Sequence, residues 1–161
     1  MSNRTIERKA AFRIIGFKTA LNDGTGIHAP QYSGQKTVFF KSMIETGSLA
    51  GLRPYAESPY GCAAVAQDDD GSVRYYAGVI SSRPLPEQAD EVHFAEGEYL
   101  VLSEKGGLSR LAFDRLEDEA FGSVLSEAYE YEYTGGPVAE VLLNGNPADA
   151  EVEVWVPVRK R

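Results

Sequence analysis

The last quarter of the chain constrains the fold most, because it contains two segments with the residue pattern of β-strands. In residues 151–158 valine occupies every second position, which is typical of a strand with one apolar face. In residues 138–143 both alternating sets are apolar, except for one acidic residue, Glu140. A strand that is apolar on both sides is expected inside a sheet whose two faces are covered.

Glu140 is the residue that this pattern singles out. It shares one face of its strand with Val138 and Leu142, where an ionised carboxylate loses hydration worth several kcal/mol. The side chain is therefore expected to be paired, protonated or ready to receive a cation. Because burial disfavours the charged form, a desolvated Glu140 is expected to have a raised pKa.

Trp155 is the second candidate, and it lies on the strand face opposite the valines. An indole ring attracts cations and stacks on aromatic rings. We therefore predict that Glu140 and Trp155 point into one cleft, with Val154 and Val156 on the opposite, helix-covered face. The alternative is that Trp155 fills one end of the core.

Composition narrows the class of protein. The chain has 161 residues, of which 43% are hydrophobic and 25% charged, so a single soluble globular domain is expected. The net charge of -8 disfavours direct binding of nucleic acid, and the basic end at residues 159–161 is the local exception.

Localisation and cofactors follow from what the sequence lacks. It has one cysteine, Cys62, and no apolar run of about 20 residues, so we predict a cytoplasmic protein without a membrane segment. The first residues also lack the apolar core of a secretory signal. His28 and His93 are the only histidines, and no glycine-rich phosphate loop occurs, so neither a metal nor a cofactor is predicted.

The order of the predicted elements favours an α+β protein with a largely antiparallel sheet. A strand over residues 6–17 precedes a helix over 35–52 and a hairpin of strands at 62–67 and 73–80. A strand pair near 91–95 and 98–103 then precedes a helix over 108–129 and the two final strands. The order strand, helix, strand, strand thus occurs twice, in halves of about 1–85 and 86–161 of one domain.

Each helix is predicted from apolar residues at three- and four-residue spacing. In the first helix they are Phe39, Phe40, Met43, Ile44 and Gly47. In the second they are Leu108, Leu111, Ala112, Leu116, Ala120, Val124 and Ala128.

Two segments carry a family resemblance: PVAEVLLNGNP at 137–147 and VEVWVPV at 152–158. Weaker support comes from SPYGCAAV at 58–65, YYAGV at 75–79 and EYLVLSEKGG at 98–107. In order and spacing they resemble the GyrI-like small-molecule-binding domains, which also occur as effector-binding domains of AraC-type and MerR-type bacterial regulators. The resemblance covers nearly the whole chain.

The resemblance implies two strand-helix-strand-strand modules that face each other across a central ligand cleft. In this family a glutamate on the penultimate strand forms the floor of an aromatic pocket, and Glu140 matches it, while Trp155 matches an aromatic position on the last strand. Ala139 and Val141 flank the acid where relatives often have a Phe before it and a Tyr soon after, which predicts a wider or less polar pocket.

Further wall residues are predicted with less support from the pattern. They are Tyr60, Phe39, Tyr76, Tyr99 and Leu142. Aromatic residues at strand or helix periodicity also pack in cores, so ordinary core packing is the alternative for each of the four aromatic residues.

Three functions are consistent with these features. The first is a stand-alone binding protein for a small, cationic or amphipathic aromatic ligand. The second is a hydrolase of reactive cyclopropane compounds, in which Glu140 acts as base or nucleophile. The third is an inhibitor that binds a topoisomerase, for which an acidic surface would suit a basic partner.

Overall fold

The computed structural model describes residues 2–58, 61–125 and 129–161, and the bounds below refer to these residues. The strands are β1 (Asn3–Lys9), β2 (Phe12–Leu21), β3 (Gly61–Gln67), β4 (Val73–Ile80), β5 (Asp90–Phe94), β6 (Gly97–Lys105), β7 (Tyr131–Tyr133), β8 (Val138–Leu142) and β9 (Glu151–Lys160). The helices are α1 (Tyr32–Glu45), α2 (Ser48–Leu52) and α3 (Ser109–Glu119), with a short 3-10 turn, η1 (Arg53–Tyr55), and a π-helical turn, η2 (Ala120–Val124).

Within this part of the chain the strands form one antiparallel sheet, in the order β1-β6-β9-β8-β3-β4-β2-β5, with β7 paired to the end of β9. The predicted α+β class and antiparallel sheet are therefore confirmed. The β8–β3 pair lies in the middle, flanked by β9 and β6 on one side and by β4 and β2 on the other. That order is compatible with two related halves, and the duplication itself stays a prediction.

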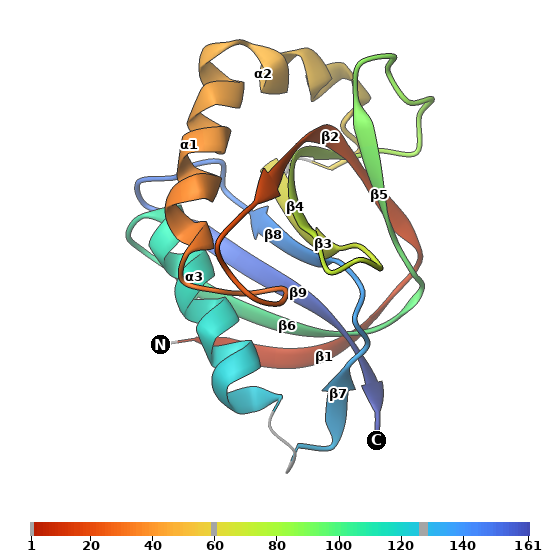
Figure 1. Ribbon diagram of the computed structural model, residues 1–161, viewed down its shortest axis with the longest axis vertical. Helices are drawn as coiled ribbons and strands as arrows, with labels where there is room; N and C mark the ends of the chain where they lie inside the picture. The colour runs from red at the N-terminus through yellow and green to blue at the C-terminus, as the bar shows by residue number, and fades with distance from the viewer. Residues whose placement is uncertain (1, 59–60, 126–128) are drawn as a thin grey trace.

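The predicted first strand is in fact two strands that belong to opposite ends of the sheet. The strand is interrupted at residues 10–11. As a result β1 pairs with β6, whereas β2 pairs with β4 and β5. Figure 1 shows β1 running along the bottom of the sheet before the chain turns upward into β2. The Phe12 ring at the start of β2 contacts the Trp155 ring of β9 at 5.6 Å between centroids. Because three strands separate β9 from β2 in the sheet order, this contact shows that the sheet is curled.

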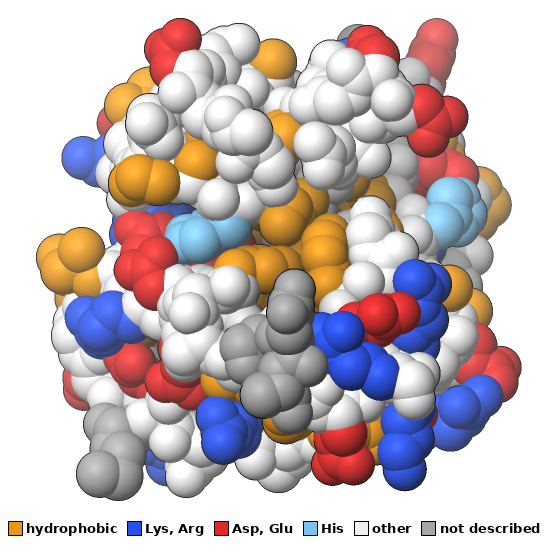
Figure 2. Space-filling view, turned by 60° about the horizontal axis from the view of Figure 1, so that its bottom comes forward, with side chains coloured by type: hydrophobic (Ala, Val, Ile, Leu, Met, Phe, Trp, Pro, Cys, Tyr) orange, Lys and Arg blue, Asp and Glu red, His pale blue; other side chains and the backbone are white. Residues whose placement is uncertain are grey.

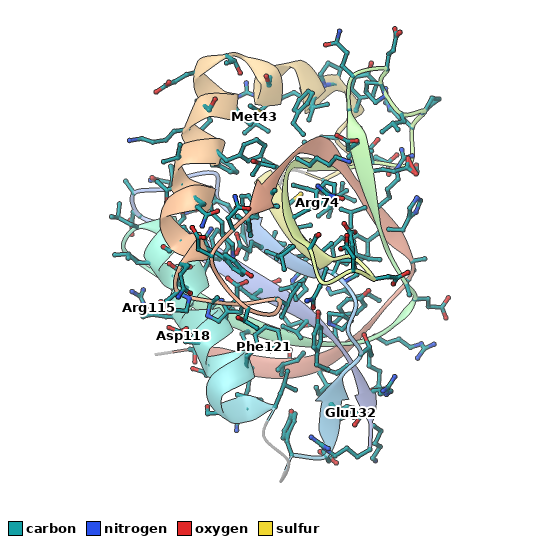
Figure 3. All side chains as sticks on the ribbon, in the orientation of Figure 1. Met43, Arg74, Arg115, Asp118, Phe121 and Glu132 are labelled. Atoms are coloured by element: carbon teal, nitrogen blue, oxygen red, sulfur yellow. The ribbon has the colours of Figure 1, made fainter. Side chains whose placement is uncertain are left out.

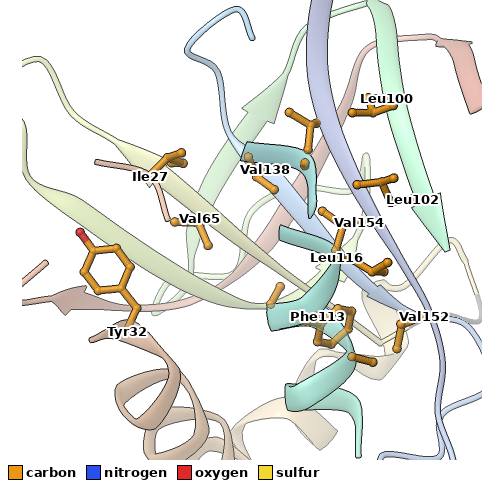
Figure 4. Close-up of a cluster of buried hydrophobic side chains, with 14 of the residues drawn as sticks. Ile27, Tyr32, Val65, Leu100, Leu102, Phe113, Leu116, Val138, Val152 and Val154 are labelled. Atoms are coloured by element: carbon orange, nitrogen blue, oxygen red, sulfur yellow. The ribbon is translucent and has the colours of Figure 1, made fainter. Parts of the chain in front are cut away.

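The outer face of the curled sheet carries the larger core and is covered by α1 and α3 (Figure 1). The buried valines of β9 pack there against Ala112, Phe113 and Leu116 of α3 (Figure 4). Pro157 is tolerated within β9 because its nitrogen lies on the same side of the strand as its carbonyl, which accepts a bond from Thr134. On that side β8 has already ended its pairing with β9 and the β7 pairing has not begun.

The inner face of the curl holds a separate aromatic cluster. Its ring-bearing members are Phe12, Tyr76, Phe94, Tyr99 and Trp155. Phe12 stacks on Phe94 with 4.4 Å between the ring centroids, and both Tyr99 and Trp155 lie within 6.1 Å of Phe12. The curl therefore closes around aromatic rings.

The strand register overturns the prediction that Glu140 and Trp155 share a cleft. Glu140 lies opposite Val154 on β9, and Trp155 lies opposite Ala139. Since directly opposed residues in a sheet share a face, Glu140 is on the helix-covered side with the valines and Trp155 is on the inner side. The alternation along each strand was predicted correctly, whereas the relative register of the two strands was not.

Other elements differ from the prediction in defined ways. The hairpin of β3 and β4 is confirmed, but β5 and β6 do not pair with each other, because β5 joins β2 and β6 joins β1 and β9. The first predicted helix is divided by Gly47, which has a φ of 77°. Leu108 and Leu111 were wrongly assigned to the buried side of α3, since they are 55% and 52% exposed. Ala128 falls outside the described residues.

No helix in the described ranges is long and apolar enough to span a bilayer.

The close approach of the paired strands β2 and β4 at Gly16 and Gly78 gives a test of the fold. A Cβ atom added at Gly78 would lie 1.8 Å from the carbonyl oxygen of Ile15, which is backbone and cannot move aside. We expect Gly78→Ala to lower the free energy of unfolding by about 3 kcal/mol or more in urea titrations. The control is Gly34→Ala on α1, where no atom lies within 4 Å, and it should stabilise the chain by about 0.5–1 kcal/mol. Equal effects of Gly78→Ala and Gly34→Ala on the free energy of unfolding would contradict this close approach of β2 and β4.

Candidate functional site

Glu140 lies beneath the two helices, where it accepts hydrogen bonds from three other elements. From α1, Lys36 Nζ lies 3.0 Å from Oε2, and from β4, the Tyr75 hydroxyl donates to Oε1 at 2.9 Å. From α3, the Arg110 guanidinium donates to both oxygens, with Nη1 at 3.0 Å from Oε1 and Nη2 at 2.8 Å from Oε2. Glu140 is therefore paired, the first of the three states that its sequence context allowed.

Two further carboxyl groups extend this cluster along α3. Glu117 is fully buried, with Oε1 at 3.6 Å from Lys36 Nζ and Oε2 at 3.4 Å from Arg110 Nη2. Asp114 lies one turn after Arg110, with its Oδ1 at 2.9 Å from Arg110 Nη2, and it also accepts a hydrogen bond of 2.6 Å from the Ser33 hydroxyl of α1. The polar groups thus join α1 and α3 to each other and to the sheet.

The electrostatics of the cluster correct a second prediction. Burial alone raises the pKa of Glu140, but the Arg110 and Lys36 charges and the hydrogen bonds that it accepts hold that pKa well below its usual range. The expected raised pKa belongs to Glu117 instead, through burial and the nearby Glu140 charge. For Lys36, burial lowers the pKa, but Glu117 and Glu140 outweigh it and the pKa is raised.

Aromatic rings surround the charged groups. Lys36 Nζ lies 5.4 Å from the Tyr75 ring centroid, and the Arg110 guanidinium lies at the same distance from the Phe113 ring. The Phe39 ring from α1 contacts Tyr75 edge-on at 6.2 Å. Positive charge held against aromatic faces is a favourable arrangement, so the site is already built to hold cations beside a carboxylate.

A second cluster of contacting side chains lies toward the C-terminal end of α3. His28 Nε2 is 2.7 Å from Asp118 Oδ1, and its ring stacks on Phe121, which in turn contacts Tyr133 edge-on at 5.2 Å. Figure 3 shows Asp118 near the lower end of α3 and Phe121 in the η2 turn that follows it, whereas Met43 of α1 lies near the top of the view. Figure 2 brings this end forward, and hydrophobic side chains gather across the middle of the face beside a histidine.

Comparison with known proteins identifies the family. A model of the GyrI-like small molecule binding domain matches residues 3–159. The chain belongs to the GyrI-like family. None of the curated proteins matches it.

Solved structures share the fold of this GyrI-like domain at low sequence identity. The structure of SAV2435 bound to tetraphenylphosphonium superposes with a TM-score of 0.81 at 16% identity, over 98% of this chain and 94% of that one. A transcription regulation protein from Staphylococcus aureus gives 0.76 at 16% identity, over 98% of both chains. The C-terminal domain of EcmrR gives 0.60 at 11% identity, over 100% and 99%.

The candidate site residues predicted from sequence divide between the two faces of the sheet. Phe39 and Leu142 lie on the Glu140 side, whereas Tyr76, Tyr99 and Trp155 belong to the aromatic cluster of the inner face. Trp155 is also engaged, because Lys9 Nζ lies 4.0 Å from its ring centroid and its indole nitrogen donates to Glu153 at 2.8 Å. Tyr60 lies outside the described residues.

Two surface hollows of this GyrI-like domain lie elsewhere. One, of about 610 Å³, lies beside Phe12, Arg13 and Phe94 at the β2–β5 edge, and the other, of about 320 Å³, lies beside Asn3 and Glu151 at the far edge. Neither is lined by Glu140. Glu140 is itself buried and in contact with Lys36, Tyr75 and Arg110, so a ligand at Glu140 must take a place that protein groups now fill.

Sequence reasoning missed the cations that pair with Glu140. Lys36 lies in α1 three residues before Phe39, and a lysine between apolar helix positions is usually read as solvated. Glu117 and Arg110 have the seven-residue spacing that puts both on one helix face, beside Leu116 and Phe113. A buried carboxylate requires a cation nearby, and that requirement was the signal that could have prompted a search for them.

Removing one cation tests the cluster. Lys36→Met keeps the approximate volume of the side chain but removes one of the two cations that pair with Glu140, so we expect a loss of about 3–5 kcal/mol in the free energy of unfolding. The control is Arg8→Met, because the Arg8–Glu96 side chains are 66% and 62% exposed and their pair should contribute at most about 1 kcal/mol. Urea unfolding measures both, and a loss for Lys36→Met as small as that of the control would contradict the buried network.

Proposed function

We propose that this GyrI-like domain binds a small cationic aromatic molecule at Glu140, with the ligand cation taking the place of the Arg110 guanidinium. The observation that carries the proposal is the bidentate pair of hydrogen bonds that Arg110 donates to the two carboxylate oxygens of Glu140. Arg110 places a delocalised cation next to Glu140 and against the Phe113 ring, and a cationic aromatic ligand would supply a positive charge and aromatic surface there without the N–H donors of the guanidinium.

Arg110 is the cation that can leave. Its side chain is 16% exposed, whereas that of Lys36 is 1% exposed. Arg110 also has a second partner, Asp114, whose side chain is 22% exposed. An Arg110 that turns toward solvent therefore keeps a carboxylate partner, while Lys36 stays beneath the helices.

The surroundings of Glu140 suit an aromatic ligand. Phe39, Tyr75 and Phe113 supply rings, and Leu142 follows Glu140 on the same face of β8. In this proposal the cleft between the two halves opens where α1 and α3 meet above Glu140. Tyr76, Tyr99 and Trp155 are not part of it, because they face the inner side of the sheet.

The family and the fold support this assignment. The GyrI-like family is a family of small-molecule-binding domains. The SAV2435 structure, which shares this fold, contains tetraphenylphosphonium, a cation whose phosphorus carries four phenyl rings. Tetraphenylphosphonium is therefore the probe for the present domain.

Hydrolysis of cyclopropane compounds and topoisomerase inhibition stay predictions from the sequence. Glu140 in its present state is a weak base, because a lowered pKa reduces the tendency of the carboxylate to accept a proton.

Tetraphenylphosphonium binding tests the proposal by isothermal titration calorimetry. Glu140→Gln removes the negative charge and should weaken binding about tenfold or more, since the attraction between opposite charges about 4 Å apart is about 1 kcal/mol in water and about 4 kcal/mol at an effective dielectric constant of about 20. Arg110→Met removes the internal competitor and should strengthen binding by a similar factor.

Two control variants distinguish binding at Glu140 from binding elsewhere on the domain. Arg115→Met removes a 54% exposed cation from the same helix, and Trp155→Phe changes the inner face, so both should leave the affinity unchanged. Unchanged affinity in Glu140→Gln, or a loss confined to Trp155→Phe, would refute the site.

A further inference from the structure

The charged cluster contains more acids than bases. Among the described residues around Glu140, its acids are Asp114, Glu117 and Glu140, and its bases are Lys36 and Arg110. Three carboxylates against two cations would leave one uncompensated negative charge beneath the helices. Because an uncompensated buried charge is costly, one of the three carboxyl groups is expected to hold a proton.

The hydrogen bonds identify Glu117 as that group. Glu140 accepts four bonds, and Asp114 accepts bonds from Arg110 and Ser33 while reaching solvent. Glu117 is fully buried, its Oε1 has no hydrogen-bond partner among the described residues, and its nearest donor to Oε2 is 3.4 Å away. A carboxyl group with so few donors is the one best left neutral.

The groups that face Glu117 from the surrounding elements support this assignment. They are Lys36 from α1, Arg110 from its own helix and Glu140 from β8, with Tyr75 of β4 bonded to Glu140. Burial raises the pKa of Glu117 first, and the Glu140 charge raises it further. The pKa of Lys36 and that of Tyr75 are raised and that of Glu140 is lowered, so Glu117 is the carboxyl group of this set whose pKa is raised, which favours its protonated form.

We propose that Glu117 exchanges its proton for the ligand cation, so that binding of a monocation at Glu140 releases one proton to solvent. This inference rests on the proposed function and adds to it a second acid. When Arg110 turns outward with Asp114, that pair remains neutral. Lys36, ionised Glu140 and protonated Glu117 stay behind with no net charge, the ligand adds one positive charge, and the proton that leaves Glu117 restores the balance.

The exchange predicts how affinity depends on pH. A site that releases one proton on binding gains affinity by about tenfold per pH unit wherever Glu117 is protonated in the free protein and ionised in the complex. Tetraphenylphosphonium should therefore bind more tightly as pH rises. Triphenylphosphine oxide, an uncharged relative of the probe, should show no such dependence.

Calorimetry of the full chain measures the exchange directly. Titrations with tetraphenylphosphonium in phosphate and in Tris, which differ in ionisation enthalpy, give the number of protons released, and we expect about one for the wild type. Glu117→Gln mimics the protonated acid without a change in size. The variant should therefore release no proton on binding, and at every pH it should bind with the affinity that the wild type shows at low pH. The control, Glu45→Gln at the exposed end of α1, should behave as the wild type.

The outcomes separate this inference from the proposed function. Binding that depends on Glu140 but releases no proton, or a pH dependence that survives in Glu117→Gln, would overturn the exchange and leave the binding site standing. An ionised Glu117 in the free protein at neutral pH, seen in its carboxyl carbon chemical shift, would also overturn it. No binding of tetraphenylphosphonium at any pH would overturn both proposals.

Discussion

The pairing of Glu140 with Arg110 and Lys36 is the interaction on which the helix-covered side of the molecule depends. Glu140 lies on a central strand, and its partners come from α1, α3 and β4. Each helix therefore contributes a cation to the same carboxylate, which sets how the two helices sit on the sheet. Apolar packing alone lacks this directional requirement, because hydrophobic contacts are not oriented.

Stability does not by itself explain why such a cluster lies in the core. Replacing a buried ion network by apolar residues of similar volume is often neutral or stabilising, so a chain that needed only a packed helix layer could dispense with it. The cluster instead provides a carboxylate whose charge is held in place before any ligand arrives. Under the proposed function, the cost of burying charge serves ligand binding, and Arg110 takes the place of the ligand cation in the free protein.

The sequence predicted the sheet better than the site, for physical reasons that individual residues illustrate. Alternation along residues 138–142 and 151–158 follows from local sterics, and both strands form with the predicted faces. The register between them depends on the turn and on the strands at each side, so Trp155 was paired with the wrong face. The partners of Glu140 are distant in sequence, with Lys36 104 positions away, and no local pattern reports such a contact. Tyr75, predicted only as part of a strand, gained its role from the same long-range packing.

The two faces of the curled sheet hold their aromatic rings in different surroundings. The inner face places Phe12, Phe94, Tyr99 and Trp155 against one another, which closes the curl with rings that already satisfy each other. The helix-covered face keeps its rings around charged groups. Under the proposed exchange, selectivity follows from competition: a ligand must interact with Glu140 and its rings better than the Arg110 guanidinium does. A weak or poorly fitting cation would then fail because the occupied site is already satisfied, whereas an empty carboxylate would accept many cations.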